Sequence, residues 1–433
     1  MALEQAGVPS IAVHTHVFAR LAKATALANG MPRTRQVFVP QPVVDRTPAE
    51  LRGYIEGTDP ISKRPFMQEV IEGLTKPLDE EDIKGATFER STPRLLPPGS
   101  EDELQQLFHD NHWTDYLPIT LPTEERVAAM LKGTSHKPDE VVGKMRPTSF
   151  REFWEYTVEK VAVNAVMAGC KPAYFPVVLA LAASGLSAKS SSTTSMTSLA
   201  VINGPIRTEI GMNCGIGSLG PYSHANATIG RAYALLSQNL QGGSVPDETY
   251  MGSLGNGLAY APCFAENEER SPWVPLHVQK GFKPTDSAVS VFFGARYMLE
   301  GYGPRDTWQE RLRRQLAAGE HFPPLIVLDP IVARLFAGRG INSKDELIQW
   351  CAANARLPAR EFWDEQWIQT LMHPLAVAGV EPFATRLKAK PDEIVAVFEA
   401  EDINVVVTGG ETQGAYRIFG ARYSKTVSID SWR

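Results

Sequence analysis

The sequence lacks the features that would place the protein in a membrane or on a nucleic acid. Its 433 residues contain no apolar run of the roughly 18–20 residues that a bilayer-spanning helix needs. The most apolar stretch, residues 175–186, predicts a buried helix instead. The N-terminus has no basic head followed by an apolar signal core. A net charge of −6 offers no basic face for a phosphate backbone. We therefore expect a soluble cytoplasmic protein with no nucleic-acid or membrane partner.

Cysteine is scarce, and its spacing matches no metal or redox motif. No two cysteines form a CxxC or a Cys/His finger pattern, so in the cytoplasm we expect free thiols rather than disulfides. P-loop and HExxH patterns are absent as well, and the GxGxxG spacing of residues 215–220 does not directly follow a predicted strand, as a dinucleotide-binding motif requires. The common nucleotide and zinc motifs therefore provide no basis for a function. The cysteines are Cys170, Cys214, Cys263 and Cys351.

The patterns that are present predict an α/β fold. Hydrophobic residues make up 43% and charged residues 21% of the chain, which is typical of a globular protein. Strand, helix and strand patterns follow one another at Val8–Val13, Val17–Asn29 and Val37–Val39, with Gly30 as the helix stop. This order predicts a partial Rossmann-like β-α-β layer over residues 1–42.

The first strand of this layer has no predicted neighbour on one side. Residues 1–6 have the pattern of the last turn of a helix, which is not stable alone. An exposed strand edge follows from this interpretation. Two explanations stay open: a ragged N-terminus, or a small partner subunit that supplies the missing strand. Further homo-oligomerisation is compatible with the second.

The rest of the chain divides into a connecting segment and a body. Residues 43–150 are rich in Pro, Glu and Lys and predict an extended wrapping segment, with short helices that begin after Thr47 and Thr123. Residues 151–433 predict a larger α/β body. Strand patterns at 394–398 and 403–408 are expected to close its sheet.

A weak internal repeat runs through the body. The strand patterns Leu199–Ile202 and Leu325–Leu328 are each followed by a Pro-Ile pair, glycines and a polar-capped helix. The repeat predicts two related halves, at about 151–295 and 296–433, with a ligand cleft between them. A small-molecule substrate is the expected occupant of the cleft.

The glycine-rich run 211–220 is the first candidate binding site. Glycines allow close approach of the backbone, and free amides at the start of the following helix attract anions. A tight crossover loop with no ligand is the alternative. His14 and His16, at the carboxyl end of the first strand, are a separate candidate pair. The remaining candidate substrate-binding residues are Asn213, Gly215, Gly217, Ser218, Asn226 and Arg231.

Carboxylates and thiols provide the candidate catalytic groups. Three glutamates lie within residues 266–269 beside large apolar residues, where Glu266 or Glu268 could act as an acid or base. A solvated charge run is the alternative. Cys170 directly precedes a helix start, which lowers a thiol pKa, and Cys263 adjoins the acidic run. The residue types also allow a metal ion, although the cofactor stays unknown. Its candidate ligands are Cys263, His224, His277 and Glu266.

Distinctive strings run through most of the chain: TDYLP (114–118), PTEER (122–126), SHKPDEVVG (135–143), VAVNAVMAGC (161–170), ANATIGR (225–231), AENEE (265–269) and SPW (271–273). They resemble a bacterial family named for a UGSC motif, in which selenocysteine or cysteine precedes Gly-Ser-Cys. The chain itself lacks such a motif, and residues 3–10 resemble the segment that follows it in the family. The resemblance therefore implies that a redox thiol motif lies on a separate small subunit or is lost. The N-terminal segment is also distantly similar to selenoprotein subunits of the glycine-reductase type.

Two functions remain in view. The first is a subunit of a small-molecule enzyme, an oxidoreductase or lyase in which thiol and carboxylate groups cleave a small polar or anionic substrate. The second is a non-catalytic binding or scaffold subunit that completes the fold of a partner chain carrying the redox motif. Loss of the hallmark motif favours the second, and the strings around Cys170 and 266–269 favour the first.

Overall fold

Helices and strands alternate along most of the chain, which confirms the predicted α/β class. None of the helices in the described residues is long and apolar enough to cross a bilayer. The computed structural model of the protein describes residues 3, 8–28, 33–77, 93–145, 154–189, 195–241, 250, 252–260, 263–296, 298–303, 306–319 and 322–433.

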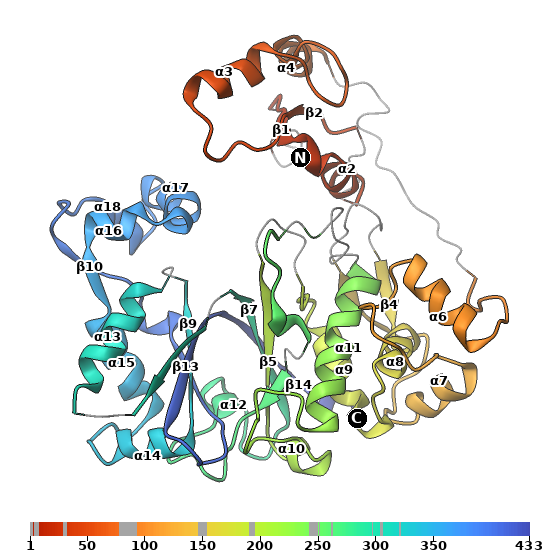
Figure 1. Cartoon of the computed structure of the whole chain (residues 1–433), viewed down its shortest axis with the longest axis vertical. Coiled ribbons are helices and arrows are strands. Elements are labelled where there is room, and N and C mark those ends of the chain that lie inside the picture. Colours follow the sequence, from red (N-terminus) through yellow and green to blue (C-terminus); the bar gives the residue numbers. More distant parts are fainter. Residues whose placement is uncertain are drawn as a thin grey trace.

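The body is a sandwich of four layers, in which two β-sheets lie between two layers of helices (Figure 1). Successive side chains of a strand point to opposite faces, and this alternation explains the arrangement. In the central strand β5, Leu199 and Val201 face the other sheet, whereas Ala200 and Ile202 face the helices. Both faces of the sheet are therefore buried, as an almost uninterrupted apolar strand requires.

The two sheets have the orders β14-β7-β5-β6 and β12-β9-β13-β8. In the first, β5 pairs in parallel with β6 and antiparallel with β7. In the second, β9 pairs in parallel with β12 and antiparallel with β13. The two sheets thus have the same topology. Their strands are β5 (Thr197–Asn203), β6 (Cys263–Ala265), β7 (Ala288–Ala295), β8 (Met298–Tyr302), β9 (Pro324–Leu328), β12 (Asn404–Val407), β13 (Ala415–Gly420) and β14 (Arg422–Ser428).

The repeated strand order groups the body into β5–β8 and β9–β14, which places the boundary after Tyr302 rather than at residue 295, and each of these halves contributes one strand to the sheet of the other. Strand β8 follows β7 in the chain but pairs with β13. Strand β14 follows β13 but pairs with β7. Because of this exchange, the two halves share hydrogen bonds in both sheets and form one folding unit rather than two separable domains.

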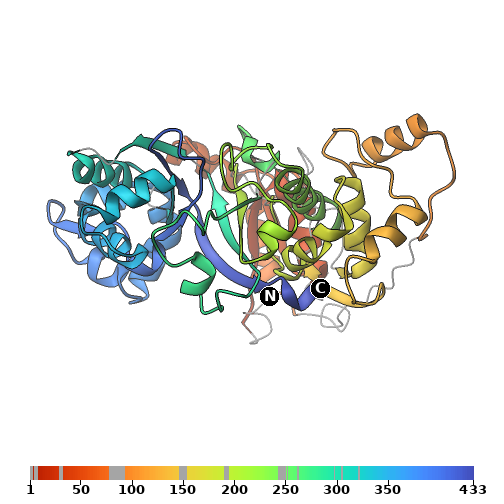
Figure 2. The same ribbon diagram turned by 90° about the horizontal axis from the view of Figure 1, so that it is seen from below.

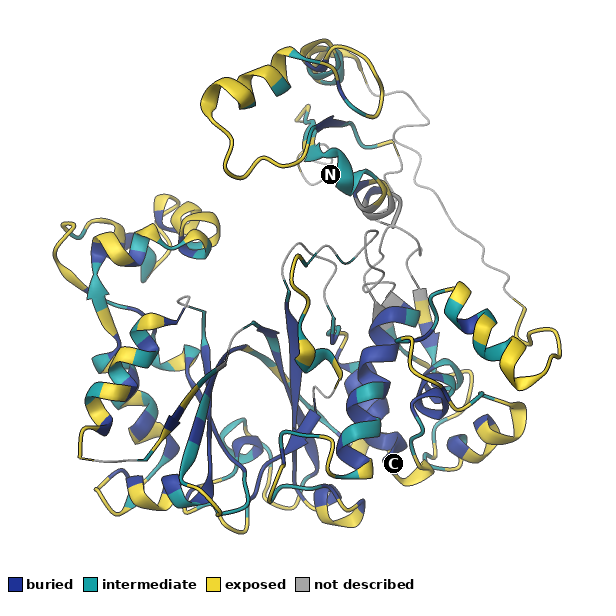
Figure 3. Ribbon diagram, viewed as in Figure 1, coloured by how far each residue is buried: buried dark blue, intermediate teal, exposed yellow. Residues whose placement is uncertain are grey.

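The helices that cover the first sheet and the central strands are the most buried parts of the body, whereas the helices that cover the second sheet expose one face (Figure 3). Helix α9 is apolar all round, as the sequence predicts for residues 175–186, and its side chains from Phe175 to Ala182 are buried. The first sheet is covered by α8 (Val158–Met167), η2 (Pro172–Tyr174), α9 (Phe175–Ala183) and α11 (His224–Gln241), and the second by α13 (Trp308–Ala318), α14 (Pro330–Ala337) and α15 (Lys344–Asn354).

Residues 8–77 form a separate unit, which we call the N-terminal layer, and Figure 1 shows it apart from the sandwich. Its two parallel strands are joined through a helix in the predicted β-α-β order. Residues 43–77 were expected in the wrapping segment, but they pack here because Phe66 and Tyr54 cover Val37 and Val39. The elements are β1 (Ala12–Thr15), η1 (His16–Phe18), α2 (Ala19–Ala28), β2 (Gln36–Val39), α3 (Pro48–Glu56) and α4 (Phe66–Thr75).

The remaining elements lie at the periphery, and Figure 2 shows the helices α6 and α7 beyond one end of the sandwich. Of the two expected closing strands, residues 403–408 contain β12, an edge strand of the second sheet. Residues 394–398 contain β11, which instead pairs with β10 in a small separate sheet. These elements are α6 (Glu101–Asp110), α7 (Glu124–Leu131), β3 (Val141–Met145), β4 (Trp154–Thr157), α10 (Ile206–Glu209), η3 (Gly257–Tyr260), α12 (Leu276–Gln279), β10 (Arg356–Pro358), α16 (Ala359–Asp364), η4 (Ile368–Met372), α17 (His373–Val377), α18 (Phe383–Leu387), β11 (Ile394–Ala396), η5 (Ala400–Asp402) and η6 (Asp430–Trp432).

Candidate functional site

The carboxyl ends of β6 and β12 meet where the two halves of the body join, and we call this region the seam. The Asn267 N–H donates to the Val407 carbonyl at 2.7 Å. In return, the Thr408 hydroxyl donates to the Ala265 carbonyl at 2.8 Å. These reciprocal hydrogen bonds join the edge strand β6 of the first sheet to the edge strand β12 of the second. The seam is therefore the place in this fold where polar side chains of both halves come together.

Glu266 is the central group of the seam, and four donors surround its fully buried carboxylate. Lys344 from the second half lies 2.5 Å away and is itself 1% exposed. The backbone N–H groups of Leu276 and Val407 and the Asn203 amide donate at 2.7, 3.2 and 2.8 Å. Burial opposes the charge of Glu266, but Lys344 and these donors outweigh it and hold the pKa of the carboxyl below its ordinary value. Glu266 is thus an anchor, with its oxygens already occupied.

Glu268 and Glu269 bind the buried guanidinium of Arg207. The Glu268 carboxylate lies 3.0 Å from Arg207 Nε and also accepts from the Asn203 amide and the Gly204 N–H, at 2.9 and 2.8 Å. The Glu269 carboxylate accepts hydrogen bonds from both terminal nitrogens of Arg207, at 2.9 and 3.3 Å. Lys344 and Arg207 therefore offset two of the three charges of the acidic run, the Glu269 side chain stays 59% exposed, and the contacts with Arg207 hold the loop after β6 against α10.

His277 lies beside this cluster with no exposed surface. Within the described part of the chain, neither ring nitrogen has a hydrogen-bond partner. Its Nδ1 lies 3.9 Å from Glu268, beyond hydrogen-bond distance. A buried polar group without a partner costs about 1–3 kcal/mol, so such a group calls for a structural or functional reason.

Cys214 is the thiol nearest the seam, half-buried in the glycine-rich loop. Its carbonyl accepts from the Gly409 N–H at 3.0 Å and from the Thr408 hydroxyl at 3.2 Å. Burial raises the pKa of the Cys214 thiol more than the nearby Arg207 lowers it. The thiol therefore stays protonated at neutral pH in this structure.

The polar groups of the glycine-rich loop 211–220 form hydrogen bonds that fix the conformation of the loop. The Asn213 carbonyl oxygen of the side chain accepts from the Gly215 N–H at 2.9 Å. Asn226 accepts from the Asn213 N–H at 3.0 Å and donates to the Ser218 carbonyl at 3.3 Å. Gly217 has a positive φ of 72°, which a side chain would strain. These contacts support the crossover-loop alternative more directly than an anion site.

The other candidate binding residues lie elsewhere. Arg231, on α11, donates to both oxygens of Asp115 at 2.8 and 2.9 Å and fixes the loop 115–118. His14 and His16 lie in the N-terminal layer, where the His14 ring contacts Phe38 and burial lowers the pKa of His14. The structure therefore distributes the predicted substrate-binding residues over three places.

The two candidate catalytic cysteines face the helical core. Cys263, on β6, is 2% exposed, and burial strongly raises the pKa of its thiol. Cys170 follows Gly169 at the end of α8, and burial raises its pKa to about 12 despite a hydrogen bond with Thr228. Because a thiolate is the reactive form, these raised pKa values disfavour a nucleophilic role for either thiol.

The candidate metal ligands are not brought together. The described residues contain no group of three or more His, Cys, Asp or Glu side chains that could hold a metal ion. Cys263 faces the core, His224 contacts the Tyr174 ring at the start of α11, and Glu266 is saturated.

Sequence reasoning missed the residues that complete the seam. Lys344 follows the helix-capping Ser343, and nothing in its local pattern indicates burial. Arg207 and Asn203 lie beside the predicted Pro-Ile pair, where the repeat could have drawn attention to them. Thr408 directly precedes the Gly409-Gly410 pair. Each of these roles depends on contacts between segments that are far apart in the sequence.

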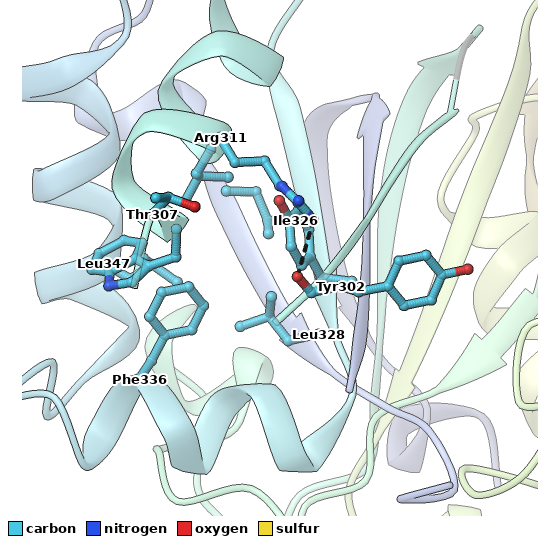
Figure 4. Close-up of a pocket in the computed structure, with 10 residues that line it drawn as sticks. Tyr302, Thr307, Arg311, Ile326, Leu328, Phe336 and Leu347 are labelled. Carbon is cyan, nitrogen blue, oxygen red and sulfur yellow. Dashed lines mark hydrogen bonds between the residues drawn. The ribbon is translucent and has the colours of Figure 1, made fainter. Parts of the chain in front are cut away.

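A small cavity under the second sheet is too small for a substrate. Its volume is about 10 Å³, the space of about one water molecule. Figure 4 shows that Ile326, Leu328 and Phe336 line one side, while Arg311 reaches across to the Tyr302 carbonyl, to which it donates at 3.2 Å.

The fold and the seam define a pseudo-symmetric α/β sandwich protein with a separate N-terminal layer. Residues 1–59 match the model of the UGSC family, which confirms the resemblance for this part of the chain. The match ends within the N-terminal layer, so the resembling strings at 114–273 lie outside it. The comparisons with curated proteins and with solved structures gave no match.

Proposed function

We propose that this chain is an assembly subunit, whose N-terminal layer pairs its open sheet with a strand of a partner chain. The observation that carries the proposal is the sheet β1–β2, which contains two strands within the described residues. Two strands alone are marginal in water and need a third strand or a packed helix; here α4 covers β2, while the outer edge of β1 has no partner strand among the described residues. A strand from another chain would complete the sheet.

The backbone of β1 is arranged for such pairing. The Ala12 N–H donates to the Arg35 carbonyl at 3.0 Å. Alternate residues of a parallel ladder serve the same neighbour, so Ala12 and His14 direct their backbone groups to β2. Val13 and Thr15 therefore direct theirs to the open edge. An exposed edge of this kind is a template for another strand.

Exposed apolar side chains of the N-terminal layer support the same proposal. Val13 is 54% exposed on β1, and Val44 is 61% exposed in the loop after β2. Large exposed apolar surfaces are typical of interaction sites. The UGSC match covers residues 1–59, which include most of this layer. Other exposed apolar residues of the layer are Val8, Val43, Ile55, Ile61, Met67, Ile71 and Leu74.

The experiment replaces Val13 by Pro and by Thr in the full-length protein in its native host. Proline removes the outward N–H of Val13 and leaves the Ala12 bond to Arg35 in place. We expect a small partner chain to co-purify with the wild type and with Val13→Thr, and to be lost from Val13→Pro. A wild-type protein that purifies as a lone stable monomer would contradict the proposal, as would equal recovery with all three chains.

A second candidate is an enzyme subunit that binds a small polar substrate at the seam. The unpartnered nitrogens of the buried His277, close to Glu268, favour this candidate. Acetate and glycolate serve as probes in thermal unfolding. If the seam binds small polar molecules, they raise the Tm of the wild type and leave that of His277→Phe unchanged. If neither probe shifts the wild type, or both proteins shift equally, the second candidate fails.

A further inference from the structure

A groove lies at the helix layer that covers the first sheet, away from the seam and from the N-terminal layer. Its volume is about 400 Å³, within the range of small-molecule sites. Helix α8 forms the floor, α6 one wall and residues 121–124 the other, and residues 94–98 form the rim. Trp113 and, from α11, Asn239 complete the lining, so the groove is built from segments of the chain that only the tertiary fold brings together.

The lining of the groove is mostly apolar. Phe108 and Trp113 pack edge to face in one wall, with ring centroids 5.5 Å apart. Met167 and Val163 present apolar side chains from the floor. At the rim, Leu95 and Leu96 are 55% and 38% exposed. Burying such surface gains roughly 25 cal/mol per Å², so an apolar occupant would be stabilised here.

Two amides provide fixed polar groups at the floor. Asn164 is 3% exposed, and its oxygen accepts from the Asn239 amide at 2.7 Å. The Asn164 amide donates to the Lys160 carbonyl at 2.9 Å, and Asn239 donates to the Trp113 carbonyl at 2.9 Å. Because these bonds fix both side chains, the polar end of a ligand would meet an amide surface of defined orientation and no net charge.

The charges at the rim offset one another. Arg94 lies 2.8 Å from Glu159 on α8 and 3.0 Å from Glu124 at the start of α7. Of these three residues, Arg94 and Glu124 line the groove, so its lining carries no net charge. The two ion pairs tie the rim to α8 and to residues 121–124, so the groove is formed before a ligand arrives.

We propose that this groove binds an uncharged small organic molecule with an apolar, ring-sized body. The volume, the apolar and aromatic lining, the neutral amides and the absence of a net charge in the lining are the four observations that select this class. The site is independent of partner binding by the N-terminal layer.

The probe is N-phenyl-1-naphthylamine, an uncharged aromatic molecule whose fluorescence rises in an apolar site. We expect it to bind the full-length protein with energy transfer from Trp113, which Trp113→Phe reduces. Leu96→Asp places a charge on the rim at an exposed position that the fold tolerates, and we expect at least tenfold weaker binding. Leu335→Asp, on α14, is the matched control, because Leu335 is also 38% exposed.

Three outcomes would overturn the assignment. The first is no binding by the folded wild type, and the second is equal binding by Leu96→Asp and the wild type, which would place the probe elsewhere. The third is release of a peptide from native-host protein on denaturation, with recovery of probe binding after its removal. That result would make a polypeptide segment the natural occupant. Circular dichroism of each variant shows that a loss of binding is not a loss of fold.

Discussion

The N-terminal layer and the body differ in how far their β-strands are paired and covered. In the body, the exchange of β8 and β14 gives each sheet four strands, and helices cover both outer faces. In the N-terminal layer, two strands share a small core around Val37, Val39 and Phe66, and many apolar side chains are exposed. The body therefore buries both faces of its sheets, whereas the layer exposes the strand edge that the proposed partner strand would occupy.

The same contrast separates the polar groups of the two regions. The seam of the body buries charges that are paired with one another, such as Glu266 with Lys344. The layer keeps its ion pairs, such as that of Arg64 with Glu72, at the surface, where they contribute little to stability. Substitutions in the seam should therefore affect global unfolding, and substitutions in the layer should act locally.

The largest effect is expected for Glu266→Gln. The substitution leaves Lys344 buried without a counter-charge, which costs about 3–5 kcal/mol for buried pairs. Urea unfolding followed by tryptophan fluorescence measures the loss. Glu361→Gln is the control, since the Glu361 side chain is 54% exposed, and we expect a change within about 0.5 kcal/mol. A loss below about 1 kcal/mol for Glu266→Gln would remove the seam as the anchor of the body.

A smaller and local effect is expected for Phe66→Ala. Phe66 is 4% exposed in the core of the N-terminal layer, and its removal should cost about 3 kcal/mol there. Hydrogen exchange should rise in residues 8–77 and stay unchanged in β5 and β9. Met67→Ala, next in the same helix and 43% exposed, is the control. Equal acceleration in the body would show that the two regions unfold as one unit.

The pH dependence of the body should follow Glu266. Its folded pKa lies below the ordinary value of 4.5, so the carboxylate stabilises the fold above pH 4.5. This contribution is lost as the pH falls below 4.5 through the folded pKa. We expect a shallower acid dependence of the unfolding free energy for Glu266→Gln than for the wild type. Identical slopes would mean that other carboxylates dominate acid unfolding.

The smallest effect is expected at the C-terminus. Glu140 and the Ser431 carbonyl raise the pKa of His136 above 6.5, and its ring packs on Trp432. The contribution is present below pH 6.5 and is lost as the pH rises through the folded pKa. Because the pair is accessible to solvent, it amounts to a few tenths of a kcal/mol. Hydrogen exchange of residues 430–433 should rise slightly with pH in the wild type, beyond the intrinsic rate, and not in His136→Ala.

Local sequence patterns predicted many of the helices and strands but not which elements pack or pair with one another. Residues 324–328 and 404–407 were recognisable as strands from their apolar runs, and the helix starts after Thr47 and Thr123 from their capping residues. The strand 422–428 was missed, because its exposed and half-buried residues give no apolar run. Its place beside β7 follows from the exchange between halves, which no local pattern records.

The sequence by itself determined the α/β class, the β-α-β order of the first layer and the free thiols, because these depend on periodicity, turn residues and spacing. The tertiary structure alone decided that Glu266 is an anchor rather than an acid, through Lys344, which lies 78 positions away. A carboxylate has the same formula in either role. Its chemistry is set by the donors and the burial around it, and those are fixed only when distant segments pack.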